Sequence, residues 1–280
     1  MREDVLTFGP GGHLVGTACT PSPDQPRSGI GFILMNAGVT PRMGPHRFNV
    51  KLARRLAAHG HASLRLDLSG QGDSLASPGA DSYEQQTMSD LRAAVDTLIS
   101  QAGVHSVVVG GICSGAYAAY HYGQQDERVI GLWMFDGFTY PTAKTSLMRA
   151  LKQLRHQPKL TLHTWLDKIR QRIAAGSTAA PPPEDSSHDD DTSFGPSQDT
   201  YAAAMQALSD RGVSLFVMFS SDVLWRYSYA GQFHDAFRDH AFVKRVRCDH
   251  LPDIDHTITT LGWQTRVMSA IEDWSQQLAR

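Results

Sequence analysis

A cysteine between two glycines is the residue in this sequence whose setting most favours nucleophilic chemistry. Gly111, Cys113 and Gly115 form a Gly-x-Cys-x-Gly turn that follows the β-branched run at residues 107–109 and precedes a small-residue helix beginning at Ala116. A strand that breaks sharply into a helix lifts the middle residue to the end of a sheet, where it can attack a substrate. Glycines suit such a strained, closely packed turn because a Cβ there would clash.

The thiol of Cys113 needs help to act as a nucleophile. At its usual pKa of about 8.5, a thiol is only a few per cent thiolate at neutral pH. A neighbouring histidine and the start of the following helix would favour the thiolate. Ser114 is an alternative nucleophile, but Ile112 and Ala116 would then occupy the positions where the turn needs glycine. We therefore expect Cys113 to be the nucleophile, with a buried, non-catalytic elbow cysteine as the other interpretation.

Strand and helix patterns alternate along the first half of the chain. Continuous apolar runs, typical of strands buried on both faces, cover residues 30–35 and 129–135, in addition to the run before the cysteine. Amphipathic helix patterns cover residues 48–59 and 89–102. This alternation predicts an α/β protein with a mostly parallel sheet.

The alternation is interrupted after the third of these apolar runs. We expect a core in two parts, residues 1–137 and 212–280, with a helical cap inserted at 138–211. Within the cap, residues 176–198 are rich in Pro, Ser and Asp, a composition typical of a mobile loop. An alternating pattern at 242–247 predicts the last strand of the core.

The composition of the chain excludes several classes of function. A net charge of −2 over 280 residues argues against a general nucleic-acid binder. The sequence has no run of eighteen apolar residues and no apolar signal core at its start, so we expect no membrane span and a cytoplasmic location. The three cysteines, Cys19, Cys113 and Cys248, are too few for a disulfide framework and are not spaced like metal ligands. The motifs imply no metal and no organic cofactor.

Four motifs, taken in order, resemble those of the α/β-hydrolase superfamily. They are Asn36-Ala37-Gly38-Val39, Arg65-x-Asp67-x-x-Gly70-x-Gly72-x-Ser74, Gly111-x-Cys113-x-Gly115 and Asp255-His256-Thr257. The resemblance covers nearly the whole chain except the cap, and it implies the α/β-hydrolase fold: a mostly parallel, doubly wound sheet with an inserted helical cap. The first, third and fourth motifs also resemble bacterial hydrolases encoded with exosortase and exopolysaccharide systems. The cysteine at the elbow resembles that of dienelactone-type hydrolases.

The resemblance also implies the partners of the nucleophile. His256 follows the last predicted strand by about nine residues, where this fold presents its base, and His250 is the competitor in the same predicted loop. Asp222 ends the first strand after the cap and is the preferred acid, while Asp136 ends the strand before the cap and is the alternative. The acid would fix the histidine tautomer and stabilise the imidazolium.

The expected oxyanion hole consists of two backbone N–H groups. One belongs to Ser114, and the other to Gly38, with Val39 as the alternative donor. The superfamily often has His-Gly at this turn, where the present sequence has Asn36 and Ala37, so the second donor is left open.

Clusters of positive charge suggest contacts with an anionic substrate. Arg42, His46 and Arg47 follow the oxyanion turn and could hold a carboxylate or phosphate. Residues 141–175 of the cap contain eight Lys or Arg and one acidic residue. Their plain interpretation is a solvated helix face; the alternative is a docking surface for an acyl carrier protein or coenzyme A.

These features together predict a cysteine-nucleophile acyl hydrolase, either a thioesterase, an esterase or a lactone hydrolase. A covalent acyl-enzyme would form on Cys113 and be released by water. Because a cysteine acyl-enzyme is itself a thioester that amines attack readily, an acyltransferase is the first alternative. A non-catalytic protein that binds a ligand in the same pocket is the second.

Overall fold

One mixed sheet forms the centre of the molecule. The computed structural model describes residues 1–77, 79, 82–148, 195–223 and 226–278. Within these ranges, eight strands form one sheet in the order β1-β2-β4-β3-β5-β6-β7-β8. The strands are β1 (Arg2–Phe8), β2 (Leu14–Thr20), β3 (Ile30–Met35), β4 (Ala62–Asp67), β5 (Ser106–Ile112), β6 (Val129–Phe135), β7 (Ser214–Ser220) and β8 (Arg247–Leu251).

Strand direction divides this sheet into two parts. β1 pairs with β2, and β2 with β4, in antiparallel fashion, whereas every pair from β4 to β8 is parallel. The carboxyl ends of the parallel strands therefore meet at one edge. In an open α/β sheet this edge is where ligands bind. The prediction of an α/β protein with a mostly parallel sheet is confirmed.

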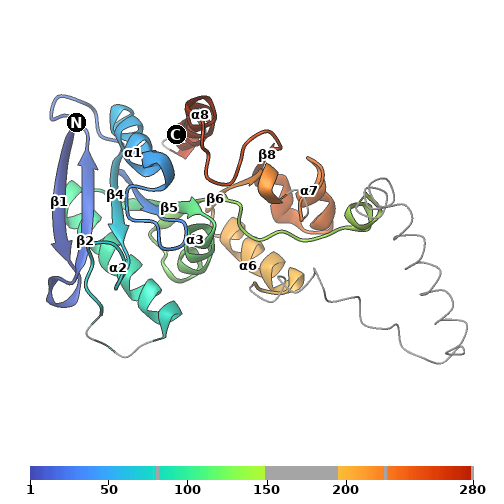
Figure 1. Ribbon diagram of the computed structural model, residues 1–280, viewed down its shortest axis with the longest axis horizontal. Coiled ribbons are helices and arrows are strands. Elements are labelled where there is room, and N and C mark those ends of the chain that lie inside the picture. The colour runs from blue at the N-terminus through green and yellow to red at the C-terminus, as the bar shows by residue number, and fades with distance from the viewer. Residues whose placement is uncertain (78, 80–81, 149–194, 224–225, 279–280) are drawn as a thin grey trace, which may run out of the picture.

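Helices cover both faces of the sheet (Figure 1). The longer helices are α1 (Phe48–Ala58), α2 (Tyr83–Ala102), α3 (Ser114–Gln125), α6 (Gln198–Asp210) and α8 (Leu261–Leu278), and the short ones are η1 (Pro10–Gly12), η2 (Pro45–Arg47), η4 (Ser221–Val223), α7 (Gln232–Ala236) and η5 (Ala241–Lys244). On one face, α1 and α8 bury side chains such as Phe48 and Trp274 against the sheet. On the other, α2, α3 and α6 bury Leu91, Tyr122 and Tyr201.

The region predicted as a cap is only partly described. Residues 143–148 begin a helix there. Helix α6, at the end of the predicted cap, packs Tyr201 and Met205 into the core, so it is a layer of the core in this structure. Residues 149–194, with most of the predicted mobile loop, lie outside the described residues. Among the helices that are described, none has the length and apolar content to cross a membrane.

The last strand lies further along the chain than its sequence pattern predicts. The prediction of a strand at 242–247 is wrong: η5 occupies the first half of this range, and β8 begins at Arg247, opposite Phe216 of β7. Phe242 and Val243 are both buried although they are adjacent, which a strand with one solvent-facing side does not allow. The burial of both side chains in the core therefore outweighs the strand preference indicated by the local alternation of apolar and polar residues.

Candidate active site

Cys113 lies on a sharp turn between β5 and α3. Its backbone has φ 56° and ψ −118°, a conformation that a residue with a side chain rarely adopts. The backbone N–H of Cys113 donates to the carbonyl of Phe135, 2.9 Å away, and the Cys113 carbonyl accepts from Ala116 at 2.9 Å. These bonds hold the strained turn, and the thiol is left half-buried at the carboxyl edge of the sheet.

The glycines that flank the cysteine allow the end of β3 to approach the turn. A Cβ on Gly115 would lie 2.6 Å from the Asn36 carbonyl oxygen, and one on Gly111 would lie 2.7 Å from the Cβ of Met35. Both distances are shorter than non-bonded atoms tolerate. The close approach matters because the loop after β3 carries the expected oxyanion donor.

His256 lies between an aspartate and the cysteine. Its Nδ1 is 2.7 Å from Oδ2 of Asp136. The other ring nitrogen, Nε2, is therefore the one available to Cys113, with which His256 has a hydrogen-bonding contact. The Asp136 carboxylate is fully buried, while the His256 side chain is 31% exposed. The three side chains thus form a chain of contacts in the order carboxylate, imidazole, thiol.

The carboxylate of Asp136 is fixed by a serine at the end of the neighbouring strand. Ser220 donates its backbone N–H to Oδ1 at 2.7 Å and its hydroxyl to Oδ2 at 2.6 Å. Asp136 itself follows β6 with φ 51° and donates its backbone N–H to Met218 at 2.9 Å. Ser220 is not among the residues predicted for the site, and its only signal in the sequence is its position at the end of a buried strand, two residues before Asp222.

The preferred acid of the sequence analysis does not contact the imidazole ring. Oδ2 of Asp222 instead accepts the backbone N–H of His256 at 2.8 Å. Asp222 lies in η4, two residues beyond the end of β7, whereas Asp136 directly follows β6, and its left-handed backbone places its carboxylate against the ring. The geometry therefore replaces Asp222 with the alternative, Asp136, as the partner of the ring.

The contacts within this group shift the protonation of both His256 and Cys113. The hydrogen bond that Nδ1 of His256 donates to Asp136, followed by the contact with Cys113, raises the pKa of His256 to about 10. The contact with His256 lowers the pKa of the Cys113 thiol below its ordinary value and outweighs the opposing effect of burial. The two shifts act in the same direction, because each charged form stabilises the other. Both shifts therefore favour the charged forms, thiolate and imidazolium, over those of the isolated groups.

The expected oxyanion donors lie next to the thiol. Ser114 is the first residue of α3, and its backbone N–H also helps to lower the pKa of Cys113. The backbone N–H of Gly38 donates to the Ser114 hydroxyl at 2.7 Å, which places this loop against the elbow. The side chain of Val39 is 82% exposed. Gly38 is therefore the donor that the structure brings to the elbow, and no contact of this kind connects Val39 to it among the described residues.

Of the three basic residues expected to bind substrate, Arg42 forms ion pairs within the protein. The guanidinium of Arg42 donates to Asp67 at 2.5 Å and to Asp73 at 2.7 Å, and the Asp67 carboxylate is fully buried. Arg42 thus fastens the loop after β3 to the loop after β4, and its guanidinium is bound by two carboxylates of the protein itself. His46 and Arg47 are exposed and have left-handed backbones, and their side chains form no hydrogen bond or ion pair with any described residue.

The other cysteines and the competing histidine lie away from this group. Burial raises the pKa of both Cys19 and Cys248 to about 11. Cys248 lies 3.4 Å from the hydroxyl of Tyr227. His250 is a residue of β8, where its ring packs at 5.2 Å from that of Tyr227, and burial lowers its pKa. None of the three contacts Asp136 or His256.

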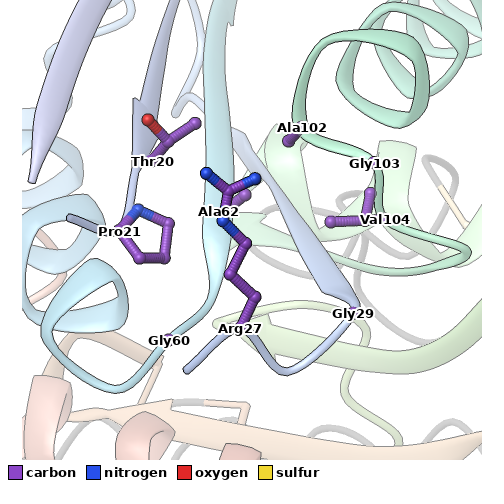
Figure 2. A pocket seen from close by; sticks show the side chains of 9 residues that line it. All are labelled: Thr20, Pro21, Arg27, Gly29, Gly60, Ala62, Ala102, Gly103 and Val104. Atoms are coloured by element: carbon purple, nitrogen blue, oxygen red, sulfur yellow. The ribbon is translucent and has the colours of Figure 1, made fainter. Parts of the chain in front are cut away.

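A pocket lies at the opposite edge of the sheet, near the start of β3 and β4 (Figure 2). Its lining consists of Thr20, Pro21, Arg27, Gly29, Gly60, Ala62, Ala102, Gly103 and Val104. A volume of about 30 Å³ accommodates water and is far below that of a ligand site. The lining of this pocket contains no cysteine, serine or histidine, so we do not assign it to the chemistry of Cys113.

Solved structures with the same fold cover almost the entire chain. A serine hydrolase without a lid from Xanthomonas campestris is 15% identical over 99% of this chain and 95% of its own, with a TM-score of 0.59. A proline iminopeptidase from Mycobacterium smegmatis is 16% identical over 99% of both chains, with a TM-score of 0.54. An esterase from Thermogutta terrifontis is 17% identical over 100% of both chains, with a TM-score of 0.51. At these identities the similarity shows the fold alone.

Sequence comparison identifies the family. No curated protein matches the chain in sequence. The profile of the Alpha/beta hydrolase family matches residues 37–258, a segment that begins at the oxyanion turn and includes Cys113, Asp136 and His256. Since this match spans well over half of the sequence, the chain belongs to the Alpha/beta hydrolase family.

Proposed function

We propose that this protein is an acyl hydrolase that cleaves a thioester, ester or lactone through a covalent intermediate on Cys113. The observation that carries the proposal is the chain of contacts from Asp136 through His256 to Cys113. Nucleophile, base and orienting acid are the three parts that covalent acyl transfer requires. Their place at the carboxyl edge of the sheet agrees with the family to which the chain belongs.

In the first half of the reaction, the Cys113 thiolate attacks the carbonyl carbon of the substrate. A carbon–sulfur bond forms, and the carbonyl oxygen becomes an oxyanion that accepts hydrogen bonds from the N–H groups of Ser114 and Gly38. When the tetrahedral intermediate collapses, the bond to the leaving thiol or alcohol breaks and His256 donates its Nε2 proton to it. The product is an acyl thioester on Cys113 and a neutral His256.

In the second half, water replaces the leaving group. Neutral His256 removes a proton from water, and the resulting hydroxide attacks the thioester carbonyl through the same oxyanion site. Collapse releases the carboxylic acid and restores the thiolate–imidazolium pair. Asp136 keeps Nδ1 of His256 protonated throughout, so that Nε2 is always the nitrogen that exchanges the proton.

The thiolate favours activated acyl groups as substrates. A thiolate is a good leaving group, so a tetrahedral intermediate formed with an unactivated ester returns to substrate more often than one formed with a thioester. This argument supports thioester or strained lactone substrates over simple esters. The acyl-enzyme would also react with an amine or alcohol, in which case the protein would be an acyltransferase.

Two features would recognise an anionic part of the substrate. His46 and Arg47 have no partner among the described residues and follow the oxyanion loop directly. At the start of the predicted cap, Lys144 lies 4.1 Å above the ring of Tyr229, while the other basic residues of the segment 141–175 lie outside the described residues. A carrier-protein or coenzyme A thioester is the substrate class that these charges favour, and a cytoplasmic location would supply it.

The test is a burst experiment on the full chain. Mixing the protein with a p-nitrophenyl ester or an acyl-coenzyme A should release one equivalent of leaving group rapidly and leave an acyl group on Cys113. Steady release in water alone identifies a hydrolase, and release that depends on an added amine or alcohol identifies an acyltransferase. A wild-type protein with neither burst nor adduct, but with saturable ligand binding, would be the non-catalytic member of the fold and would refute the proposal.

A further inference from the structure

The Ser114 hydroxyl occupies a position that the proposed function reserves for the substrate. Gly38 donates its backbone N–H to this hydroxyl oxygen at 2.7 Å. In the proposed reaction the same N–H would donate to the oxyanion. The Gly38 N–H, an expected donor of the oxyanion hole, therefore donates to an acceptor within the protein. The Ser114 hydroxyl must move before a carbonyl oxygen can accept from this N–H.

The second expected donor is also engaged within the elbow. The backbone N–H of Ser114 stabilises the thiolate of Cys113 and contributes to its lowered pKa. The Cys113 sulfur, the Ser114 hydroxyl oxygen and the N–H groups of Gly38 and Ser114 thus form a compact group. Both N–H groups donate to acceptors of the protein itself. Because the sulfur becomes neutral when it bonds to the acyl carbon, the Ser114 N–H is released for the oxyanion at the moment it is needed.

The hydroxyl of Ser114 retains an unused proton. It acts as acceptor towards Gly38, and no described residue accepts a hydrogen bond from it. A serine side chain moves between staggered rotamers at little cost, while the backbone of the elbow stays fixed. An oxygen atom bound to the Gly38 N–H at the usual 2.7–3.1 Å would lie next to this hydroxyl.

We propose that the Ser114 hydroxyl is a third donor of the oxyanion hole, which holds the place of the carbonyl oxygen until substrate binds. On attack, the substrate oxygen takes over the Gly38 N–H, and the hydroxyl turns to donate its proton to the same oxygen as a hydrogen bond. No bond to Ser114 is made or broken, and its proton stays on the hydroxyl throughout. This inference rests on the proposed acyl chemistry at Cys113.

Two kinds of electrophile separate this role from general support of the elbow. Acylation by an ester passes through an oxyanion, whereas alkylation by iodoacetamide displaces iodide at a saturated carbon and forms none. Both reactions require the same Cys113 thiolate and the same His256. The rate of alkylation therefore reports whether the elbow is folded and charged, and the rate of acylation reports in addition on the oxyanion hole.

The experiment compares wild type with Ser114→Ala and Ser114→Thr. Acylation is followed as the burst rate with p-nitrophenyl acetate, and alkylation as the rate of iodoacetamide labelling of Cys113 at the same pH. Ser114→Ala should acylate about 100-fold more slowly, the lower end of the loss caused by removing one oxyanion donor, and should alkylate at the wild-type rate. Ser114→Thr keeps the hydroxyl and should recover most of the acylation rate.

Each contrary result has a distinct meaning. Equal or faster acylation by Ser114→Ala would show that the hydroxyl only blocks the Gly38 N–H, and would overturn the proposal. If acylation and alkylation slowed in parallel, Ser114 would support the structure of the elbow and not the oxyanion. If Ser114→Ala and Ser114→Thr lost the same acylation rate, the hydroxyl would not be the group that matters. Either result would also overturn the proposal. Failure of the proposed function itself would be seen earlier, as absence of any burst in wild type.

Discussion

Two regions of the molecule combine a nucleophile, a histidine and an aspartate, but they differ in the order of contacts. They consist of Cys113, His256 and Asp136 in the candidate active site, and of His13, Ser69 and Asp90 in what we call the His13 cluster. In the first region the imidazole is in the middle. In the second the hydroxyl is in the middle, 3.0 Å from Nε2 of His13 and 2.9 Å from Oδ1 of Asp90.

The surroundings of the histidines differ as well. Nδ1 of His13 is bonded to the carbonyl of Pro10 at 2.7 Å, a neutral acceptor that cannot stabilise an imidazolium as a carboxylate does. The His13 and Asp90 side chains are almost fully buried, and Gln86 also donates to the Ser69 hydroxyl, at 3.3 Å. The His13 cluster therefore fastens loops to α2, whereas the candidate active site presents a half-exposed thiol. Residue types alone do not distinguish the two regions, but the order of contacts does.

The largest difference between the regions should appear when the two nucleophiles are removed. Cys113→Ala should lower kcat/KM for acyl transfer by about 10⁵-fold, because covalent catalysis is lost entirely. Ser69→Ala is the matched change in the His13 cluster and should leave kcat/KM near the wild-type value. Comparable losses in the two variants, measured with the same thioester, would contradict the assignment of the nucleophile.

The second difference concerns the two carboxylates near His256. Asp136→Asn should lower kcat by about 10³-fold, because the amide no longer holds the required tautomer. Asp222→Asn should cost less than about tenfold, since an amide oxygen can still accept the His256 backbone N–H. Steady-state kinetics of the two variants, each isosteric with wild type, show which carboxylate orients His256. A larger loss in Asp222→Asn would restore Asp222 as the acid and refute the geometry described above.

The third difference is the pH dependence of thiol reactivity. The pKa of Cys113 is lowered by His256, so alkylation by iodoacetamide should rise with pH and level off below the ordinary thiol pKa of about 8.5. His256→Ala removes the main cause of the lowering and should shift the curve to higher pH. Peptide mass spectrometry at each pH gives the rate at Cys113, with Cys248 as the internal control.

Cys248 should remain unlabelled over the same range of pH. Burial raises its pKa to about 11, so very little thiolate forms. Labelling of Cys113 and Cys248 with the same pH profile would show that His256 has no effect on Cys113, and would argue against the thiolate–imidazolium pair.

The smallest effect on activity is expected in the His13 cluster. His13→Ala removes the imidazole that bonds Ser69 and the Pro10 carbonyl, and should lower the free energy of unfolding by about 1–3 kcal/mol. At temperatures where the variant is folded, its kcat should match wild type. Thermal unfolding and kinetics on one preparation test both statements, and a selective loss of kcat would give the cluster a part in the chemistry.

Much of the fold could be predicted because its signals are local. The buried runs at β3, β5 and β6 and the glycines around Cys113 lie within short windows of sequence. The strained turn at Cys113 can be recognised from five consecutive residues. The displaced last strand is the exception, since the burial of Phe242 depends on packing against Phe233 and Phe237 and on contacts of η5 with α6, which the local alternation does not reveal.

The choice between two acids could not be made from local signals. Asp136 and Asp222 both follow parallel strands and lie at the same edge of the sheet. The choice depends on the left-handed backbone at Asp136 and on the two donors of Ser220, which is 84 residues away in the sequence. The partner of Arg42 is also non-local, although only 25 residues away: the charge of Arg42 is visible in the sequence, but its pairing with the buried Asp67 is not.

The acyl-enzyme is the most direct test of the central claim that Cys113 is the nucleophile. Wild type and Cys113→Ala would be mixed with p-nitrophenyl acetate, quenched in acid within the burst, digested and analysed by mass spectrometry. The account predicts one acetyl group on the peptide that contains Cys113, bound to its sulfur and removed by neutral hydroxylamine, and none in the variant. An acetyl group on Ser114, or the absence of any adduct in wild type despite turnover, would contradict it.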